Sequence, residues 1–525
     1  MNARGLAQGT AAPATPASPS LEGKHVVLMI CDGLRPDYVT EANMPTLAKL
    51  AKSGATFTKH HPVYLSSTET NGTAIATGCW PSTSGILANS EYRPEIDKKK
   101  GIRLDGTDVM VKDDEITGGK HIGRDTIAEI IQKAGGRTAI AGTKAVALLM
   151  DRKQITGGQK GSAAISVGKV YPADLQVQVD AAAGGPFPKE ITYPNTTADA
   201  WTTKALLQGL WKDGVPTLSV LWMSDPDYSQ HQKAPGSPEA LASLKSVDDN
   251  LASVLAALEA RGVREKTHIF LASDHGFSSI STLLDTQKTL QDWGFAAKAQ
   301  YVLDPRPGEI VIVDLGGTTF FYVVGHDKEV IQKLVTKLQG WEHAGVIFTK
   351  EALPGAYALS DEKLDSVNAP DVAVSFKWSE APGRFGMKGQ IPCSMSKYPV
   401  DGGMHASLSR YDMHNTFIAA GPGIRPGFVG TIPSGNTDVA PTLLSLLGLH
   451  DAAAAMDGRI LHEALRSGEG LPLPAVEAEK LLPLKLASPV KAWAPYLKAT
   501  TVGKAVYFDE GNNASEAGPQ AARAE

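Results

Sequence analysis

Cysteine is scarce in this sequence: 525 residues contain only Cys31, Cys79 and Cys393. Three scattered cysteines cannot form a disulfide framework, and a chain of this length can bury a stable core without one. The sequence therefore lies outside the disulfide-rich class of small secreted proteins, and its cysteines do not indicate a cellular compartment.

Long apolar runs and an excess of basic residues are missing as well. No stretch reaches the roughly 18 apolar residues that a transmembrane helix needs. The formal net charge of −5 excludes the basic footprint of a protein that binds bulk nucleic acid. With 42% hydrophobic and 20% charged residues, the composition is that of an ordinary globular protein. We therefore expect no membrane span and no nucleic-acid partner.

The N-terminal stretch lacks the apolar segment of an intact signal peptide. Residues 1–22 are rich in Ala, Pro, Ser, Gly and Thr, which predicts a disordered leader. We interpret it as the spacer that follows a removed signal peptide, which would place the protein in the periplasm or outside the cell. A plain flexible leader is the alternative.

Three runs of strand type stand out, at residues 26–31, 218–224 and 267–273. The first has no polar alternation, which predicts a strand buried on both faces, and we expect all three to be core strands of one sheet. Ligands bind at the carboxyl ends of such strands, and we expect the polar residues there to meet at one sheet edge. These residues are Asp32-Gly33, Asp225-Pro226-Asp227 with His231, and Asp274-His275-Gly276.

Helical patterns between the strands complete an α/β pattern. Residues 125–134 predict a capped amphipathic helix before a strand at 137–142, and Ser237-Pro238 opens a long helix with one apolar face. This alternation predicts a doubly wound, mostly parallel sheet flanked by helices. Residues 90–122 and 151–200 are expected to be a surface insertion and an irregular stretch.

The mixed pattern of residues 280–400 predicts a smaller α+β cap inserted in the main fold. The last dozen residues are expected to be disordered. The predicted division is a leader at 1–22, a catalytic core at 23–280 and 401–465, a cap at 281–400 and a C-terminal extension at 466–525.

Six side chains are candidate metal ligands: Asp32, Asp227, His231, Asp274, His275 and His405. Carboxylates and imidazoles together suit zinc, with manganese or iron possible. Two sets of three would leave each ion an open position for substrate, whereas a closed structural site takes four ligands. Each motif alone is more often structural. It is the convergence of three strands on one edge that favours a metal site.

The order of these residues resembles the alkaline phosphatase superfamily, and within it the branch of type I phosphodiesterases and nucleotide pyrophosphatases. The motifs that carry the resemblance, from about residue 25 to 450, are Asp32, Thr68-x-x-Asn71, Thr77-Gly78, Asp227-x-x-x-His231, Asp274-His275-Gly276 and His405. The resemblance implies an alkaline phosphatase-like fold and two divalent metal ions, zinc first among them. The implied ligand sets are Asp227, His231 and His405 for one ion and Asp32, Asp274 and His275 for the other.

The resemblance also implies that Thr68 is the nucleophile, in contact with the second ion, and that Asn89 contacts the phosphate. A threonine hydroxyl ionises near neutral pH only beside a cation, and a helix N-terminus at Thr68 would seat a phosphate. We expect a phospho-threonine intermediate that water hydrolyses. Ser66 and Ser67 are rival nucleophiles, and a plain helix cap is the structural alternative for Thr68.

A second, weaker resemblance points to sulfatases. Their signature has cysteine or serine, then proline, then arginine, and Cys79-x-Pro81-x-Thr83 follows it only in part. The arginine is missing and Cys79 lies beyond the far end of the helix that Thr68 opens. We therefore reject a sulfatase.

The net charge of the predicted pocket bears on whether it binds a phosphate diester or a monoester. Two divalent ions and three aspartates leave the pocket with one net positive charge, which suits a singly charged diester better than a dianionic monoester. Lys144 is a candidate further cation, because related threonine-type phosphatases carry Lys-x-Arg; here Val146 stands at the arginine position. A solvated side chain is the alternative for Lys144.

The prediction is a zinc-dependent phosphodiesterase or nucleotide pyrophosphatase acting on a small-molecule phosphate ester. The alternatives are a threonine-type alkaline phosphomonoesterase, a metal-dependent phosphoryl transferase or mutase, and an inactive metal-binding module. Oligomeric state stays open.

Overall fold

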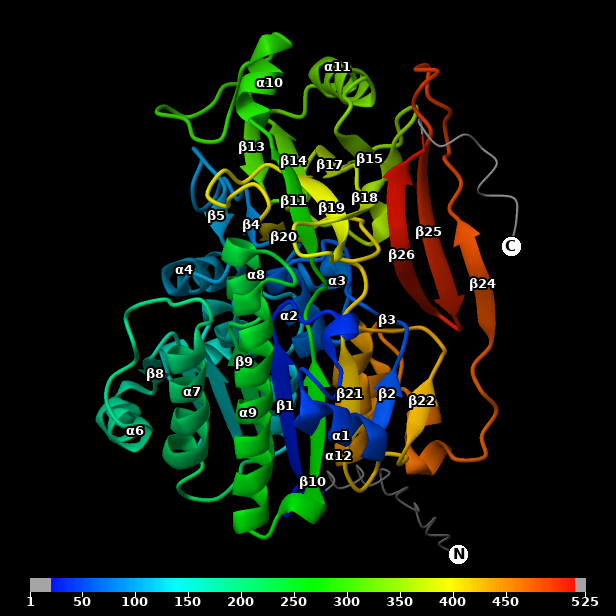
Figure 1. Ribbon diagram of the computed structural model, residues 1–525. Coiled ribbons are helices and arrows are strands. Elements are labelled where there is room, and N and C mark those ends of the chain that lie inside the picture. Colours follow the sequence, from blue (N-terminus) through cyan, green and yellow to red (C-terminus); the bar gives the residue numbers. More distant parts are fainter. Residues whose placement is uncertain (1–19, 515–525) are drawn as a thin grey trace, which may run out of the picture.

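The computed structural model describes residues 20–514, so residues 1–19 of the predicted leader and the predicted disordered end from 515 lie outside the described residues. Its centre is a nine-stranded sheet (Figure 1). In sheet order the strands are β22 (Phe428–Gly430), β2 (Ala55–Phe57), β21 (Phe417–Ala420), β10 (Thr267–Ala272), β1 (His25–Cys31), β9 (Leu218–Met223), β6 (Thr138–Gly142), β7 (Ala163–Ser166) and β8 (Lys169–Tyr171).

Five neighbouring strands, from β10 to β7, run parallel, while β8 and β21 are antiparallel to their partners. The central strand β1 is buried on both faces, as its unbroken apolar run predicts. Its alternate residues join two different cores, Val26, Leu28 and Ile30 on one side and Val27, Met29 and Cys31 on the other.

Helices cover both faces of this sheet (Figure 1), which confirms the predicted doubly wound α/β class. One face is packed by α1 (Pro45–Ser53), α7 (Thr196–Lys204) and α9 (Pro238–Ala260), and the other by α2 (Thr68–Thr77), α5 (Ile127–Lys133) and α12 (Val439–Leu447). Helix α9 begins where the Ser237 side chain accepts a hydrogen bond from the Ala240 N–H, an N-cap, and Pro238 fits the first turn.

Two expectations about connecting segments were wrong. Residues 151–200 are not irregular: β7 and β8 extend the central sheet and α6 (Gln176–Ala183) and α7 follow. Residues 90–122 are not a plain surface insertion, because Leu104 and Met110 are buried against the main core. The strands in both segments are short, and the helices, including α4 (Thr107–Thr117), separate apolar from polar residues only weakly, so no clear hydrophobic period is visible in the sequence.

A second, six-stranded sheet lies within the predicted cap, above the first in Figure 1. Helices α10 (Thr286–Asp292) and α11 (Lys328–Gln339) accompany it. Its strands, in order, are β12 (Ala297–Lys298), β13 (Ile310–Asp314), β14 (Thr318–Val323), β17 (Val372–Phe376), β15 (Ala344–Thr349) and β16 (Tyr357–Ala358). This sheet confirms a smaller inserted part, while the division of the chain into core, cap and extension stays a prediction.

A four-stranded sheet connects the two larger ones. Its strands are β18 (Ser379–Pro382), β19 (Lys388–Cys393), β11 (Ser278–Leu283) and β20 (Gly403–Met404). Strand β11 pairs antiparallel with β20, with Ser278 opposite Met404. This pairing brings the chain after β10 beside the chain before His405.

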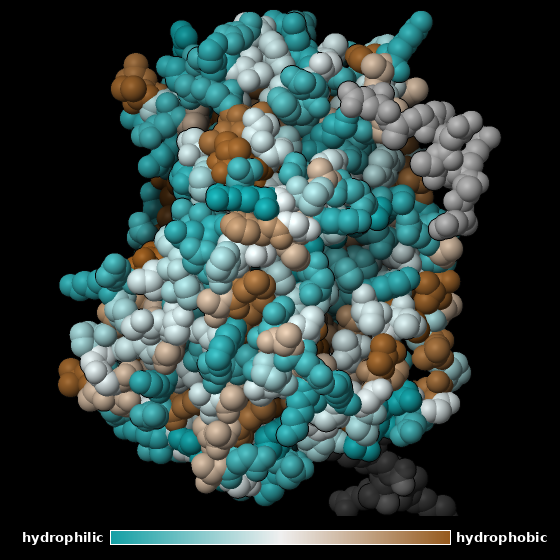
Figure 2. Space-filling model, in the orientation of Figure 1, coloured by the Kyte–Doolittle hydropathy of each residue, from teal (hydrophilic) through white to brown (hydrophobic). Residues whose placement is uncertain are grey.

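The predicted C-terminal extension contains a three-stranded sheet of β24 (Val476–Leu481), β25 (Pro495–Val502) and β26 (Ala505–Asn513). Strand β26 contacts β3 (His60–His61), shortly before α2. On the face in Figure 2 the apolar residues form separate small groups among polar ones, outside the grey part. Within residues 20–514, the helices are too short or too polar to cross a bilayer.

Candidate binuclear metal site

The six predicted metal ligands meet at the carboxyl edge of the central sheet. Strands β1 and β10 lead directly into Asp32 and Asp274, and β9 leads into α8 (Asp227–Lys233). The pairing of β11 with β20 adds His405. Each of the six residues is at most 5% exposed: Asp32, Asp227, His231, Asp274, His275 and His405.

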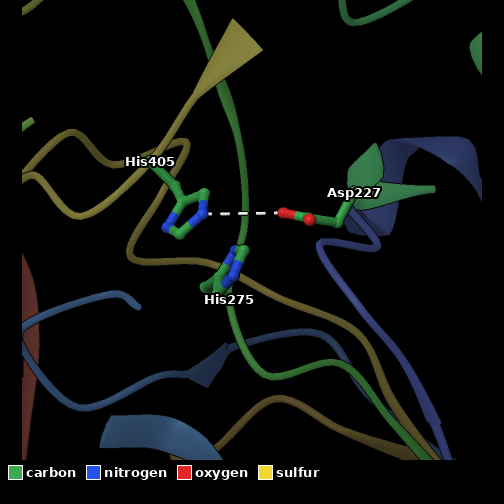
Figure 3. A group of neighbouring side chains, drawn as sticks. All are labelled: Asp227, His275 and His405. Atoms are coloured by element: carbon green, nitrogen blue, oxygen red, sulfur yellow. Dashed lines mark ion pairs between the residues drawn. The ribbon is translucent and has the colours of Figure 1, made fainter. Parts of the chain in front are cut away.

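These side chains form two groups whose ligand atoms lie within 4.8 Å of one another, and His275 belongs to both: Asp227, His275 and His405, and Asp32, Asp274 and His275. Figure 3 shows the first group, with a dashed line for the 3.5 Å between His405 Nε2 and Asp227 Oδ1. His231 Nε2 lies 3.2 Å from the same Asp227 oxygen. The geometry therefore differs from the implied sets by placing His275 between them, stacked on His405 at 3.6 Å.

The three imidazoles are oriented alike. Nδ1 lies 2.8 Å from the Gly403 carbonyl oxygen in His231, 2.9 Å from that of Gly276 in His275 and 2.8 Å from that of Ser66 in His405. A carbonyl only accepts, so each Nδ1 carries the hydrogen and each Nε2 lone pair faces the carboxylates.

The charge state suits metal binding too. Burial lowers the pKa of His275, and burial together with the His275 ring lowers the pKa of His405 well below its ordinary value. Neutral imidazole is the form that binds metal.

The aspartates present oxygens that need a cation. Asp32 Oδ1, Asp227 Oδ1 and Asp274 Oδ2 are buried and accept no hydrogen bond within the part of the chain that the structure describes. They face Nε2 lone pairs, and a buried array of acceptors alone is costly. Burial, and after it the charge of Asp274, raises the pKa of Asp32. The donor set therefore fits divalent metal ions.

The remaining carboxylate oxygens are held by the chain itself. Trp222 Nε1 donates to Asp32 Oδ2 at 2.8 Å, and the Gly33 N–H donates to Asp274 Oδ1 at 3.0 Å. Gly33 has φ of +67°, and a Cβ there would come within 2.9 Å of the Phe277 ring. Both the conformation and the close approach require glycine.

Lys144, just after β6, lies inside the site. Its Nζ is 2.9 Å from Asp32 Oδ2 and 2.8 Å from Asp227 Oδ2. Its side chain is 13% exposed. The alternative of a solvated lysine is therefore wrong.

Thr68 is the first residue of α2 and is 4% exposed. Its Oγ1 lies 3.3 Å from His275 Nε2. The neighbouring hydroxyls are engaged elsewhere, since Ser66 donates to the Ser407 carbonyl at 2.8 Å and Ser67 Oγ lies 2.9 Å from Thr70 Oγ1. Of the three hydroxyls at 66–68, the one of Thr68 faces the candidate ligands.

Asn89 lines the same cavity as Thr68. Its Oδ1 accepts a hydrogen bond from the Glu69 N–H at 3.1 Å, which leaves its Nδ2 amide group as the donor available to a substrate. The cavity has a volume of about 350 Å³ and also includes Lys144, Tyr228 and Tyr398.

Sequence reasoning gave no role to the residues that hold these parts together, although Asn71 belongs to the motif Thr68-x-x-Asn71. Asn71 Nδ2 donates to the carbonyls of Val63, Leu65 and Ser67, and so fixes the turn before α2. Asn436, far along the chain, contacts Asn71, and no motif points to it. The sequence predicts that Trp222 lies in a strand, but no pattern in it indicates that the indole reaches Asp32.

The chain is similar to known proteins over most of its length. The family described as type I phosphodiesterase / nucleotide pyrophosphatase matches residues 26–383, more than half of the chain. A murine bis(5'-adenosyl)-triphosphatase enpp4 (Mus musculus) is 21% identical over 81% of this chain and 77% of its own length. A venom phosphodiesterase of Naja atra is 22% identical over 76% of this chain and 41% of its own length.

Xenopus laevis bis(5'-adenosyl)-triphosphatase enpp4 is 22% identical, and the match spans about half of each chain. The solved structure of murine ectonucleotide pyrophosphatase / phosphodiesterase 5 aligns with a TM-score of 0.58 at 18% identity, covering 84% of this chain and all of that one. This likeness confirms the alkaline phosphatase-like fold. The chain belongs to the type I phosphodiesterase / nucleotide pyrophosphatase family, a branch of the alkaline phosphatase superfamily whose members hydrolyse phosphoric esters.

Proposed function

We propose that this protein is a binuclear-metal phosphodiesterase or nucleotide pyrophosphatase that uses Thr68 as its nucleophile. The observation that carries the proposal is the 3.3 Å contact between Thr68 Oγ1 and His275 Nε2, at a buried edge with three carboxylates and three imidazoles. Family membership supports the reaction class.

We propose Asp227, His231 and His405 for one divalent ion and Asp32, Asp274 and His275 for the other, with zinc first among the candidates. His275 Nε2 lies near both sets, and its single lone pair can bind one ion only. When bound, such ions would lower the pKa of the Thr68 hydroxyl and neutralise charge on the phosphoryl and leaving oxygens.

The chain's own residues orient the reaction. Thr68 Oγ attacks phosphorus in line, the bond from phosphorus to the leaving oxygen breaks, and a phospho-threonine forms that water then hydrolyses. The positive N-terminal end of α2 would face the phosphoryl group, and Asn89 Nδ2 would donate to a non-bridging oxygen. Burial of Thr68 excludes bulk water from the first step.

A threonine-type monoesterase is the second candidate, and the position of Lys144 favours it. Its ammonium contacts both Asp32 and Asp227, which adds a positive charge beside the substrate. A dianionic monoester gains more from that charge than a singly charged diester does.

We also propose a small-molecule phosphate ester as the substrate and a periplasmic or secreted location. The likeness to a venom enzyme supports a location outside the cytosol.

The deciding experiment compares hydrolysis of bis-(4-nitrophenyl) phosphate with 4-nitrophenyl phosphate, with zinc content measured on the same protein. We expect faster cleavage of the diester and about two zinc ions per chain. A clear preference for the monoester would replace the first candidate with the second. Activity that survives complete chelation would contradict both.

A further inference from the structure

The loop between β19 and β20 places two residues on the wall of the substrate cavity. Both Lys397 and Tyr398 line it. The Tyr398 ring stacks on the His231 imidazole, with centroids 4.2 Å apart and planes 7° apart. Lys397 Nζ lies 4.7 Å from the centre of the same ring. The Tyr398 ring therefore packs against a candidate metal ligand, and the exposed Lys397 ammonium lies beside that ring at the cavity wall.

Three cations from separate segments face this cavity, and two of them are already paired. Arg103 pairs with Glu69 and, at 2.7 Å, with Asp105. Lys144 pairs with Asp32 and Asp227.

Lys397 differs from the other two cations. Within residues 20–514, no carboxylate lies at ion-pair distance from it. Burial, and next the charge of Arg103, lowers the pKa of Lys397, so it is in a cationic neighbourhood. An anionic group of the substrate would supply the missing partner.

The position of Lys397 relative to Thr68 indicates which anionic group of the substrate it would bind. Thr68 contacts His275, whereas Tyr398 stacks on His231 and Lys397 lies beside the Tyr398 ring. In-line attack places the leaving oxygen opposite Thr68, which in the proposed reaction is the side of Asp227, His231 and His405. A charged extension of the leaving group therefore reaches Lys397.

We propose that Lys397 is a specificity-determining residue that binds the negative charge of the leaving group, as in a phosphoanhydride whose leaving group is a phosphate or pyrophosphate. This inference rests on the proposed function. It predicts discrimination by leaving-group charge at a constant retained group.

The test uses two substrates that leave thymidylate on the enzyme. Thymidine 5'-triphosphate releases pyrophosphate, and thymidine 5'-monophosphate 4-nitrophenyl ester releases 4-nitrophenolate. With the metal-loaded enzyme, Lys397→Gln should lower the ratio of kcat/KM for the triphosphate to that for the ester about tenfold, the value of one charge-assisted hydrogen bond. Lys397→Glu should lower it further, and Lys397→Arg should restore most of it.

Inhibition by the products gives a binding readout. Inhibition of ester cleavage by pyrophosphate should weaken about tenfold in Lys397→Gln, by the same reasoning, while inhibition by thymidine 5'-monophosphate weakens much less. Lys491 is an exposed lysine outside this cavity, so Lys491→Gln is the matched control. It should leave the kcat/KM ratio and the inhibition by both products at the wild-type values.

The outcomes separate the two proposals. If Lys397→Gln lowers kcat/KM equally for both substrates, or for neither, Lys397 has no such role and the proposed function stands. The same holds if the wild type cleaves the ester but not the triphosphate. If the metal-loaded wild type cleaves neither substrate, the proposed phosphodiesterase fails and the inference fails with it.

Discussion

Asn436 Nδ2 lies 2.9 Å from Asn71 Oδ1 and 2.7 Å from the Asp274 carbonyl oxygen. One buried amide therefore ties helix α2, which begins at the proposed nucleophile Thr68, to the loop that carries two candidate metal ligands. The distance between Thr68 and His275 depends on this tie, because neither segment pairs with the other through backbone hydrogen bonds.

Asn436→Ala should lower kcat about tenfold or more, since small errors in the position of a nucleophile cost that much. It should also lower the free energy of unfolding by about 1–3 kcal/mol, because buried partners stay unpaired. Steady-state kinetics and denaturant unfolding measure the two effects. Asn250→Ala, at a buried asparagine on α9 bonded to the Ser246 carbonyl, is the control and should lose stability without a matching loss of kcat. Equal kcat in the two variants would show that Asn436 positions nothing.

Thr68→Ala should abolish turnover by at least about a thousandfold, because no neighbouring hydroxyl can take its place. Ser66→Ala and Ser67→Ala should keep the nucleophile and lose far less. With the thymidylate ester as substrate, mass spectrometry of acid-quenched protein should detect a thymidylyl group on Thr68 in the wild type. The same group found on Ser67 instead would show that Ser67, and not Thr68, is the nucleophile.

His231→Ala and His275→Ala should each lose one metal ion. The Nδ1–H of His275 donates to the Gly276 carbonyl, so only its Nε2 can bind a metal, and it can bind one ion. In the proposed sets each variant loses one ligand in three of a different ion, and we expect about one zinc ion per chain after dialysis against weak chelator. Elemental analysis measures the zinc content, and two retained zinc ions in either variant would contradict the place of that histidine in its set.

Glu362 should make stability depend on pH. It is buried, neither carboxyl oxygen accepts a hydrogen bond from the described residues, and burial, followed by Asp361, raises its pKa well above the ordinary 4.5. The folded chain keeps the proton after the unfolded chain has lost it, so this group's contribution to stability is full below pH 4.5 and is lost as pH rises above that value.

Glu362→Gln removes that titration. The variant should gain at least about 1 kcal/mol over the wild type at pH 8 and much less at pH 5. Denaturant unfolding at both pH values measures the difference. Glu351→Gln, on an exposed ion pair with Lys328, is the control and should show little pH-dependent gain. A constant difference between wild type and Glu362→Gln would show that the carboxyl is not protonated in the fold.

The sequence predicted the fold class because buried parallel strands require unbroken apolar runs, and such runs stand out without any homologue. It also predicted where Asp32, Asp227 and Asp274 would gather, since the carboxyl ends of neighbouring parallel strands share one edge. Segments 90–122 and 151–200 were misjudged because their strands are short and their helices lack a clear apolar face.

What the sequence determined by itself is therefore the set of side chains delivered to one sheet edge, a consequence of chain direction and burial. Tertiary structure alone decided how these side chains are grouped and which other residues hold them in place. His275 stands between two ligand groups because β11 pairs with β20, Asn436 joins α2 to the Asp274 loop, and Lys397 reaches the cavity on a loop between short strands. Each of these contacts joins segments distant along the chain, and no local pattern of residues encodes such a meeting.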